Sequence, residues 1–324
     1  MKMRSVSFAA ACMTAFACIC TCPAAVSAES ETITVGDFVF EENTVYGGYE
    51  LTEYKAVSVE VIVPDMVEGK PVTKIGEKVF RKNQSVKRVT LPDTIKVIGT
   101  AAFSGCASLE EINMPAELEI IESDAFNSCK ALKAVEFGDK VTTIKLSAFQ
   151  LCTELKTLTI PGSVETVLEH SFHGLSSLQT LTFEEGVKNI EVDSFLNTSE
   201  LQSVYFPRSI EIIEPYTIGF RYRYAGDELP YIKLDDVVIY GYPGTAAESY
   251  AAEYGFEFVN RALGDANDDG RFDASDAVTL QNYILRRTGE CSVNADMNGD
   301  GVLNSFDICL IRKKLISEQI QAEY

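Results

Sequence analysis

Oxygen-bearing side chains recur at a fixed spacing in two segments near the C-terminal end of this 324-residue sequence. Residues 265–276 read D-A-N-D-D-G-R-F-D-A-S-D, and residues 296–307 read D-M-N-G-D-G-V-L-N-S-F-D. Both place a carboxylate or an amide at positions 1, 3, 5, 9 and 12 and a glycine at position 6. Calcium takes several oxygen ligands, and glycine allows the sharp turn that wraps a loop around the ion. The spacing therefore predicts a pair of calcium loops.

The two loops predict two bound Ca²⁺ ions with equivalent ligands. The first set is Asp265, Asn267, Asp269, Asp273 and Asp276, with the carbonyl of Arg271 at position 7. The second set is Asp296, Asn298, Asp300, Asn304 and Asp307, with the carbonyl of Val302 at position 7. Four carboxylates against three predict tighter calcium binding in the first loop. The alternative is a pair of acidic turns without metal, but two complete loops in tandem disfavour it.

The loops differ from the usual EF-hand in two respects. Asp stands at position 12 in place of Glu, and no clear amphipathic helix enters either loop. In both respects segment 264–316 resembles a type I dockerin, which implies two loop-plus-helix repeats within a small all-α domain over 264–324. The implied helices cover 277–287 and 308–316. Their apolar faces are expected from Val278, Leu280, Ile284, Leu285, Cys309, Ile311, Leu315 and Ile316.

Dockerins bind cohesin modules of scaffoldin proteins, so the resemblance implies a cohesin partner and attachment to a cellulosome. The family's recognition residues occupy loop positions 10 and 11 and the helix that follows. Carried over, they are Ala274, Ser275, Gln281 and Asn282 in the first repeat and Ser305, Phe306, Arg312 and Lys313 in the second. Because the halves differ in size and charge, we expect one binding mode, with Phe306 as the apolar anchor. Cys291 and Cys309 could form a disulfide, but free thiols are favoured because Cys309 matches Val278.

A 23-residue repeat fills the middle of the chain and provides the scaffold that precedes the loops. Its phenylalanines are Phe80, Phe103, Phe126, Phe149, Phe172 and Phe195. Apolar residues also recur five positions before and six, nine and eleven positions after each of them. The alternation at nine and eleven predicts a short strand with one buried face, and the phenylalanine is expected on a turn or short helix opposite it. Stacked coils would share one continuous core, so we expect a solenoid.

The repeat resembles a known family. Residues 109–129 read L-E-E-I-N-M-P-A-E-L-E-I-I-E-S-D-A-F-N-S-C, similar to the leucine-rich repeats of the BspA, or Treponema pallidum, type. The resemblance covers about residues 58–218. We expect an N-terminal cap formed by a hairpin within 29–57, repeats over 58–230 and a C-terminal cap over 231–259. A linker over 260–263 is short enough to fix the orientation of the two modules.

The expected strands of three coils present polar residues to solvent. These are Thr157, Thr159, Thr180, Thr182, Ser203 and Tyr205. Such a strip could bind a polysaccharide or an extended peptide, although threonine also simply suits exposed strands. Cys106, Cys129 and Cys152 recur at the repeat period and could bind metal or pair, but small apolar filling explains them better. We expect His170 and His173 on the surface.

Composition and the N-terminal end limit the function. Lys and Arg total 28 against 48 Asp and Glu, and the net charge of −20 disfavours nucleic acid and anionic membranes as partners. Residues 1–28 have a positive start, an apolar stretch and a small-residue Val26-Ser27-Ala28 end, which predicts a secretory signal peptide. No later apolar run is long enough to predict a membrane span.

Together these features predict a secreted, cellulosome-bound, non-catalytic protein with a role in plant polysaccharide degradation. One alternative is a glycoside hydrolase or another carbohydrate-active enzyme, because dockerins are usually fused to such enzymes. That chemistry needs two carboxylates across a cleft, and the repeats already occupy every stretch long enough for a catalytic domain. A surface adhesin is the other alternative.

Overall fold

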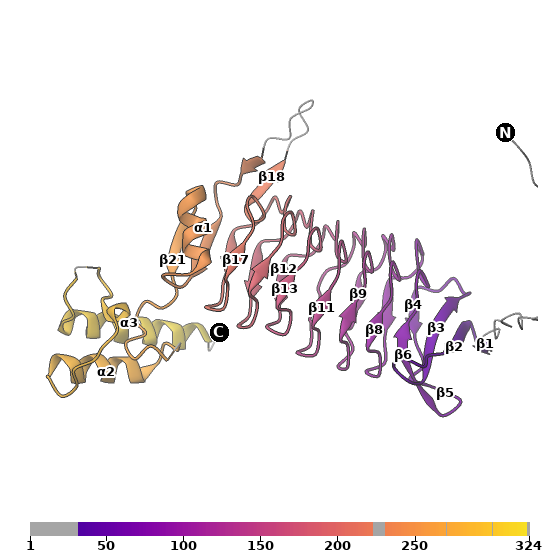
Figure 1. Ribbon diagram of the computed structural model, residues 1–324, viewed down its shortest axis with the longest axis horizontal. Coiled ribbons are helices and arrows are strands. Elements are labelled where there is room, and N and C mark those ends of the chain that lie inside the picture. The colour runs from indigo at the N-terminus through magenta and orange to yellow at the C-terminus, as the bar shows by residue number, and fades with distance from the viewer. Residues whose placement is uncertain (1–31, 223–230, 270, 300, 323–324) are drawn as a thin grey trace, which may run out of the picture. The chain divides into compact units, whose positions relative to one another are not determined.

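The computed structural model describes residues 32–222, 231–269, 271–299 and 301–322 (Figure 1). The predicted signal peptide lies outside these ranges. So do residues 223–230 of the expected repeat segment and Asp300, a predicted ligand of the second loop.

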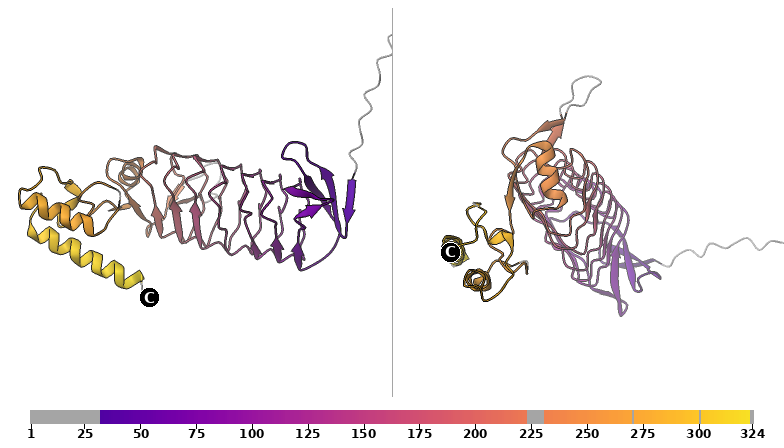
Figure 2. Two further views of the ribbon diagram at one scale, coloured as in Figure 1. Left: turned by 90° about the horizontal axis from the view of Figure 1, so that it is seen from below. Right: turned by 60° about the vertical axis from the view of Figure 1, so that its left-hand side comes forward.

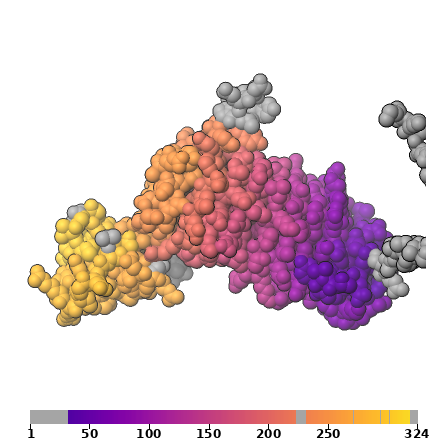
Figure 3. All heavy atoms as spheres, viewed as in Figure 1, coloured from indigo at the N-terminus to yellow at the C-terminus, as the bar shows by residue number. Residues whose placement is uncertain are grey.

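The central region is a solenoid in which each coil lies over the one before it in sequence order (Figures 2 and 3). Short parallel strands carry the residues eight to eleven positions after the phenylalanine, and they pair in two separate sheets. One sheet contains β4 (Glu60–Ile62), β7 (Arg88–Thr90) and β9 (Glu111–Ile112), and the other contains β12 (Thr157–Ile160), β14 (Thr180–Phe183) and β16 (Ser203–Tyr205). The register follows the repeat, because Thr157 pairs with Thr180 and Thr180 with Ser203. These are the strands that the alternating pattern predicts.

A second set of parallel strands ends five residues before the phenylalanines, and most of these strands span only two residues. They also pair in two sheets. One contains β6 (Lys70–Ile75), β8 (Val97–Ile98), β10 (Ile120–Ile121) and β11 (Thr143–Ile144), and the other contains β13 (Thr166–Val167), β15 (Asn189–Ile190) and β17 (Ile212–Ile213). Two residues are too few to show an alternating pattern, so the sequence revealed the buried column but not the strand.

The repeated phenylalanines form an aromatic column through the core. From Phe80 to Phe195 successive rings are 4.9–5.5 Å apart between centroids and within 13° of parallel. All six are buried. These phenylalanines lie on turns of the described coils. The residues two positions before and after the ring have left-handed backbone conformations, as at Asp124 (φ 58°) and Ser128 (φ 61°) around Phe126. Such residues end a right-handed helix, so of the two expected alternatives, a turn or a short helix, these positions adopt the turn.

The N-terminal end of the solenoid is covered by a three-stranded antiparallel meander. It contains β1 (Thr32–Val35), β2 (Phe38–Glu42) and β3 (Tyr49–Tyr54). Strand β3 then pairs in parallel with β6, and β5 (Met66–Val67) pairs with β6 in the antiparallel sense. The expected hairpin is therefore part of a larger unit that continues the solenoid sheet.

The C-terminal end is covered by mixed elements. Strand β18 (Phe220–Tyr222) pairs with β19 (Tyr231–Lys233), while β20 (Val238–Gly241) and β21 (Glu257–Asn260) extend the strand ladder beyond β16. Between them α1 (Ala246–Tyr254) buries Ala247, Tyr250 and Ala251. The Tyr250 hydroxyl donates to the carbonyl of Ile218 at 2.8 Å, which joins the helix to the last coil.

The C-terminal helices are α2 (Ala274–Ile284) and α3 (Ser305–Ala322), with a 3-10 turn at Val293–Ala295. Both begin three residues earlier than expected, α2 ends three residues earlier and α3 extends further. The core of this part contains Ala266, Ala277, Leu280, Ala295, Ile308 and Ile311. Four of the eight residues expected on the buried apolar faces are instead exposed to solvent. They are Val278, Leu285, Cys309 and Ile316.

Candidate metal and partner-binding site

The last position of the first loop joins its two ends. The Asp276 carboxylate accepts the Ala266 N–H at 2.9 Å and the Asp273 N–H at 2.7 Å. Asp273 in turn accepts the Ser275 N–H at 2.7 Å, which completes a capping box at the start of α2. Loop positions 9 to 12 are thus also the first turn of the helix, which explains why α2 begins earlier than the sequence suggested.

The second loop repeats this arrangement 31 residues later. The Asp307 carboxylate accepts the N–H groups of Met297 and Asn304, each at 3.0 Å. Asn304 accepts the Phe306 N–H at 2.7 Å. The same positions make the same bonds in both loops, so the sequence repeat is also a repeat of local geometry.

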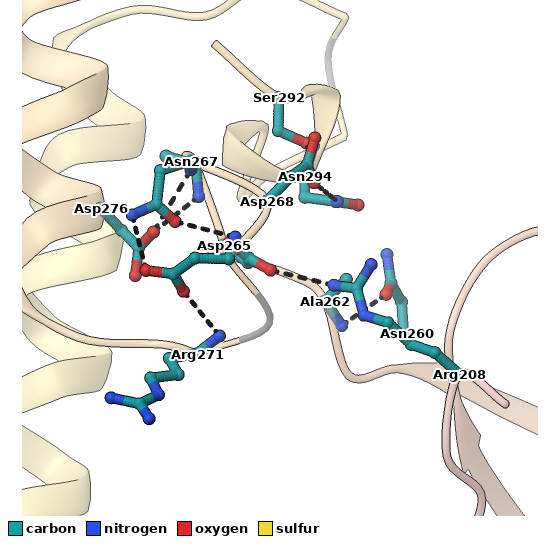
Figure 4. Close-up of polar contacts among 12 residues, drawn as sticks. Arg208, Asn260, Ala262, Asp265, Asn267, Asp268, Arg271, Asp276, Ser292 and Asn294 are labelled. Carbon is teal, nitrogen blue, oxygen red and sulfur yellow. Dashed lines mark hydrogen bonds and ion pairs between the residues drawn. The ribbon is translucent and has the colours of Figure 1, made fainter. Parts of the chain in front are cut away.

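Local hydrogen bonds also hold the oxygens of other described ligands, and those around Asn267 in the first loop are drawn in Figure 4. Asn267 accepts the Asp269 N–H at 3.2 Å, and Asp269 accepts the Arg271 N–H at 2.8 Å. In the second loop Asp296 accepts the N–H groups of Gly299 and Gly301 at 2.8 and 2.7 Å. These bonds orient side-chain oxygens along the loops, and carboxylate and amide oxygens suit a hard cation.

Three of these carboxylates are removed from solvent. Asp265, Asp276 and Asp307 are buried. Burial raises the pKa of Asp276, and the negative charge of Asp265 raises it further, while three backbone N–H groups oppose the shift. A cation would remove both penalties, so the residues present fit calcium. Among the described residues, however, no three His, Cys, Asp or Glu side chains converge on one metal position.

The proposed cohesin residues lie on the outer faces of α2 and α3. Ala274, Ser275 and Gln281 are exposed on α2, and Asn282 is half-buried. On α3, Ser305, Phe306, Arg312 and Lys313 are exposed, and Phe306 is 55% accessible. The two faces adjoin, because Arg312 donates to the Gln281 side chain at 3.3 Å.

Sequence reasoning missed four residues of these faces. Val278 on α2 and Leu285 directly after its end lie three and ten residues beyond Ser275, and Cys309 and Ile316 on α3 lie three and ten residues beyond Phe306. Val278, Leu285 and Ile316 are more than half accessible, at 55%, 52% and 58%. Their helical spacing from loop position 11 indicates that they share a face with the recognition residues, whereas their apolar side chains favoured a place in the core.

The hydroxyl strip lies on the outward face of the solenoid strands. Its members form two rows in register, Thr157–Thr180–Ser203 and Thr159–Thr182–Tyr205. The second row continues to Tyr240 on β20, whose ring stacks on Tyr205 at 4.5 Å. The Arg261 guanidinium also lies over the Tyr205 ring, 5.7 Å from its centroid.

The cysteine ladder and the histidines have structural settings. Cys106, Cys129 and Cys152 are buried free thiols, each placed to donate to the carbonyl of the phenylalanine 26 residues earlier, at 2.9–3.2 Å. Burial raises the pKa of Cys106 to about 11 and that of Cys152 to about 12. The described thiols Cys291 and Cys309 are free as well.

His173 corrects an expectation, because it is buried rather than on the surface. Its Nε2 lies 3.1 Å from the side-chain nitrogen of Asn197. Its ring packs against the Tyr222 ring in a T-shaped arrangement, with 5.9 Å between the centroids. Both contacts come from later coils or the cap, so the repeat pattern alone did not predict them. His170 remains partly exposed, with Nε2 at 3.5 Å from Asp193.

Comparisons with known families identify both regions. The BspA type leucine rich repeat region matches in 6 copies over residues 65–172 and 97–221, and the dockerin type I domain matches residues 263–316. Curated proteins give no match. None of the helices in the described ranges is long and apolar enough to cross a membrane.

Two solved structures share the solenoid fold, and a third is reported beside them. A leucine-rich repeat protein from Bacteroides ovatus is 21% identical with a TM-score of 0.51, and the match covers 66% of this chain and 50% of that one. A leucine rich cell surface protein from Faecalibacterium prausnitzii is 25% identical with a TM-score of 0.50, over 67% and 65% of the two chains. The Treponema pallidum leucine rich repeat protein matches at 24% identity and a TM-score of 0.47, over 53% and 91%.

The chain thus spans about half of the length of the Bacteroides ovatus protein and about two thirds of the Faecalibacterium prausnitzii protein. The repeat match, the dockerin match and the geometry of the two regions agree with one another. The chain therefore carries a BspA-type leucine-rich repeat solenoid followed by a type I dockerin domain.

Proposed function

We propose that this chain is a secreted, non-catalytic binding protein that attaches to a cellulosome through its dockerin. Two calcium ions would order the paired loops, with the ligands named above. The adjoining faces of α2 and α3 would then bind a cohesin module. The solenoid would bind a polysaccharide or a protein, which gives the protein a role in plant polysaccharide degradation.

The observation that carries the proposal is the pair of equivalent loop-helix units, each with an exposed apolar face. An interface of this kind needs a large buried anchor and a rim that excludes water. Phe306 and Ile316 offer the larger apolar side chains on α3, with Arg312 and Lys313 beside them. The corresponding positions on α2 hold Ser275, Leu285, Gln281 and Asn282. The α3 face is therefore the better anchor for one dominant orientation.

The solenoid strip supports a binding role for the repeats. Its outward threonines supply hydroxyl donors and acceptors in two straight rows, and Tyr205 and Tyr240 add aromatic surface at one end. A chain of sugars or an extended peptide could follow such rows by hydrogen bonding at regular intervals.

The test is calorimetric titration of the full secreted chain with a panel of type I cohesins, in calcium chloride and in chelator. We expect binding to at least one cohesin only in calcium. The double variant Phe306→Ala/Arg312→Glu should weaken that binding about tenfold or more, because it removes the anchor and reverses a rim charge.

The matched control is Ser275→Ala/Asn282→Glu, which changes loop position 11 and one helix recognition residue of the first repeat. It should leave cohesin affinity within about threefold of the unchanged chain. The opposite ranking of the two double variants would show that α2 supplies the dominant face. If the chain binds none of the cohesins in calcium, the proposed attachment to a cellulosome is contradicted.

A further inference from the structure

A residue of the solenoid contacts the first ligand of the first calcium loop. The Arg208 Nη2 atom lies 3.0 Å from Oδ2 of Asp265, although the two residues are 57 positions apart in sequence (Figure 4). The Asp265 side chain is 3% accessible and that of Arg208 is 41% accessible. The carboxylate is thus buried beneath a guanidinium that remains partly open to solvent.

Arg208 is held in this position by its own neighbours. Its backbone N–H donates to Glu185 at 2.7 Å, and its guanidinium lies 4.4 Å from the ring centroid of Tyr242. A guanidinium over an aromatic face is stabilised by the charge distribution of the ring. The side chain is therefore directed toward Asp265 by the last coil and the segment after β20.

The linker between the domains is also bonded along its length. The Arg261 N–H donates to the Gly241 carbonyl at 2.7 Å, and its guanidinium donates to the Phe206 carbonyl at 3.0 Å. Lys314 of α3 donates to the Leu263 carbonyl at 2.8 Å. These bonds bring the start of the loop to the last coil, where Arg208 meets Asp265.

We propose that Arg208 competes with calcium for the charge of Asp265, so that the solenoid lowers the calcium affinity of the first loop. The proposal rests on the calcium binding proposed above. A carboxylate has two oxygens, so Asp265 can contact both cations. Two cations that share one carboxylate nevertheless repel each other, and each weakens the binding of the other.

The coupling acts in both directions. If Arg208 weakens calcium binding, calcium must weaken the Arg208–Asp265 contact by the same factor. The contact would be strongest at low calcium and would loosen as calcium fills the loop. Calcium would therefore release one bond between the solenoid and the dockerin while it orders the loop.

This inference lowers the difference in calcium affinity that ligand counting predicts between the two loops. Four carboxylates against three predicted tighter binding in the first loop, but one of the four is shared with a guanidinium from outside the loop. Only the folded chain brings that guanidinium to the site. We therefore expect the advantage of the first loop to be reduced in the full chain and restored when Arg208 is neutralised.

The experiment is a two-site calorimetric titration of the metal-free full chain with calcium chloride. Arg208→Gln should tighten one of the two sites about fivefold or more and leave the other unchanged. Arg208→Lys keeps the positive charge and should remain closer to the unchanged chain. Arg88→Gln, the same substitution on a distant coil where Arg88 pairs with Glu60 and Glu111, should shift neither site.

The variant Asp296→Ala, which impairs the second loop, assigns the shifted site when it folds. Where it does not fold, the titration of the chain with both loops still shows whether one affinity changes. Unchanged or weaker binding in Arg208→Gln would overturn the inference, because competition requires tighter binding. Absence of calcium binding by the unchanged chain would instead contradict the proposed function.

Discussion

At the scale of single residues, burial shifts the pKa values of ionisable side chains. His173 shows this most directly, since it is buried beside His170, Asp193, Asn197 and Tyr222. Burial lowers its pKa, the nearby His170 lowers it further, and Asp193 opposes the shift. The folded state therefore favours the neutral imidazole more than the unfolded state does.

We predict that the solenoid loses stability as the pH falls below about 6.5, the usual pKa of histidine. The unfolded chain then binds a proton at His173 that the folded chain resists, and the free energy of unfolding decreases. His173→Gln should flatten this dependence, which denaturant unfolding between pH 7.5 and pH 5 would measure. His170→Gln is the matched control. It should retain the pH dependence of the free energy of unfolding, because burial is the main cause of the lowered pKa of His173. Equal slopes in the unchanged chain and in His173→Gln would contradict the prediction.

At the scale of elements, the coils depend on the aromatic column. Phe149 stacks between Phe126 and Phe172 at 4.9 and 5.5 Å, and the edge of Phe137 adds a further ring contact. Each coil contacts its neighbours, so the loss of one ring removes packing on both sides.

We predict that Phe149→Ala lowers the free energy of unfolding of the solenoid by about 3–5 kcal/mol, because the cavity cannot close without shifting two coils. Chemical denaturation followed by circular dichroism measures this loss. The same substitution at the exposed Phe306 should leave the solenoid transition unchanged. A loss below about 1 kcal/mol at Phe149 would indicate that neighbouring coils fill the space.

The elements also show how far the sequence could predict the structure. It predicted the apolar columns and the paired loops, because stacking and metal binding both require the same residue type at the same interval. It missed the helix starts at Ala274 and Ser305, because loop ligands also serve as helix caps. It missed the burial of His173 and the Arg208–Asp265 contact, because those partners come from outside the repeat or the loop.

At the scale of the whole molecule, the two domains differ in what stabilises them. The solenoid has one hydrophobic cluster that extends from Phe40 to Phe256, whereas the buried cluster of the dockerin contains six residues. Three of those six are alanines. Ala266 and Ala277 adjoin the buried Asp276, and Ala295 precedes Asp296 in sequence. For a core of this size, the calcium that we propose for the two loops would supply much of the stability.

We therefore predict that a chelator unfolds residues 264–316 and leaves the solenoid folded. Hydrogen exchange followed by mass spectrometry should show that peptides from α2 and α3 lose protection while peptides from the coils keep it. The variant Asp276→Ala/Asp307→Ala should reproduce this pattern in the presence of calcium, because it removes the carboxylates that join the two ends of each loop. Protection lost in both domains would show that they unfold together, and the contacts of Arg208 and the linker would then transmit the loss of calcium into the last coil.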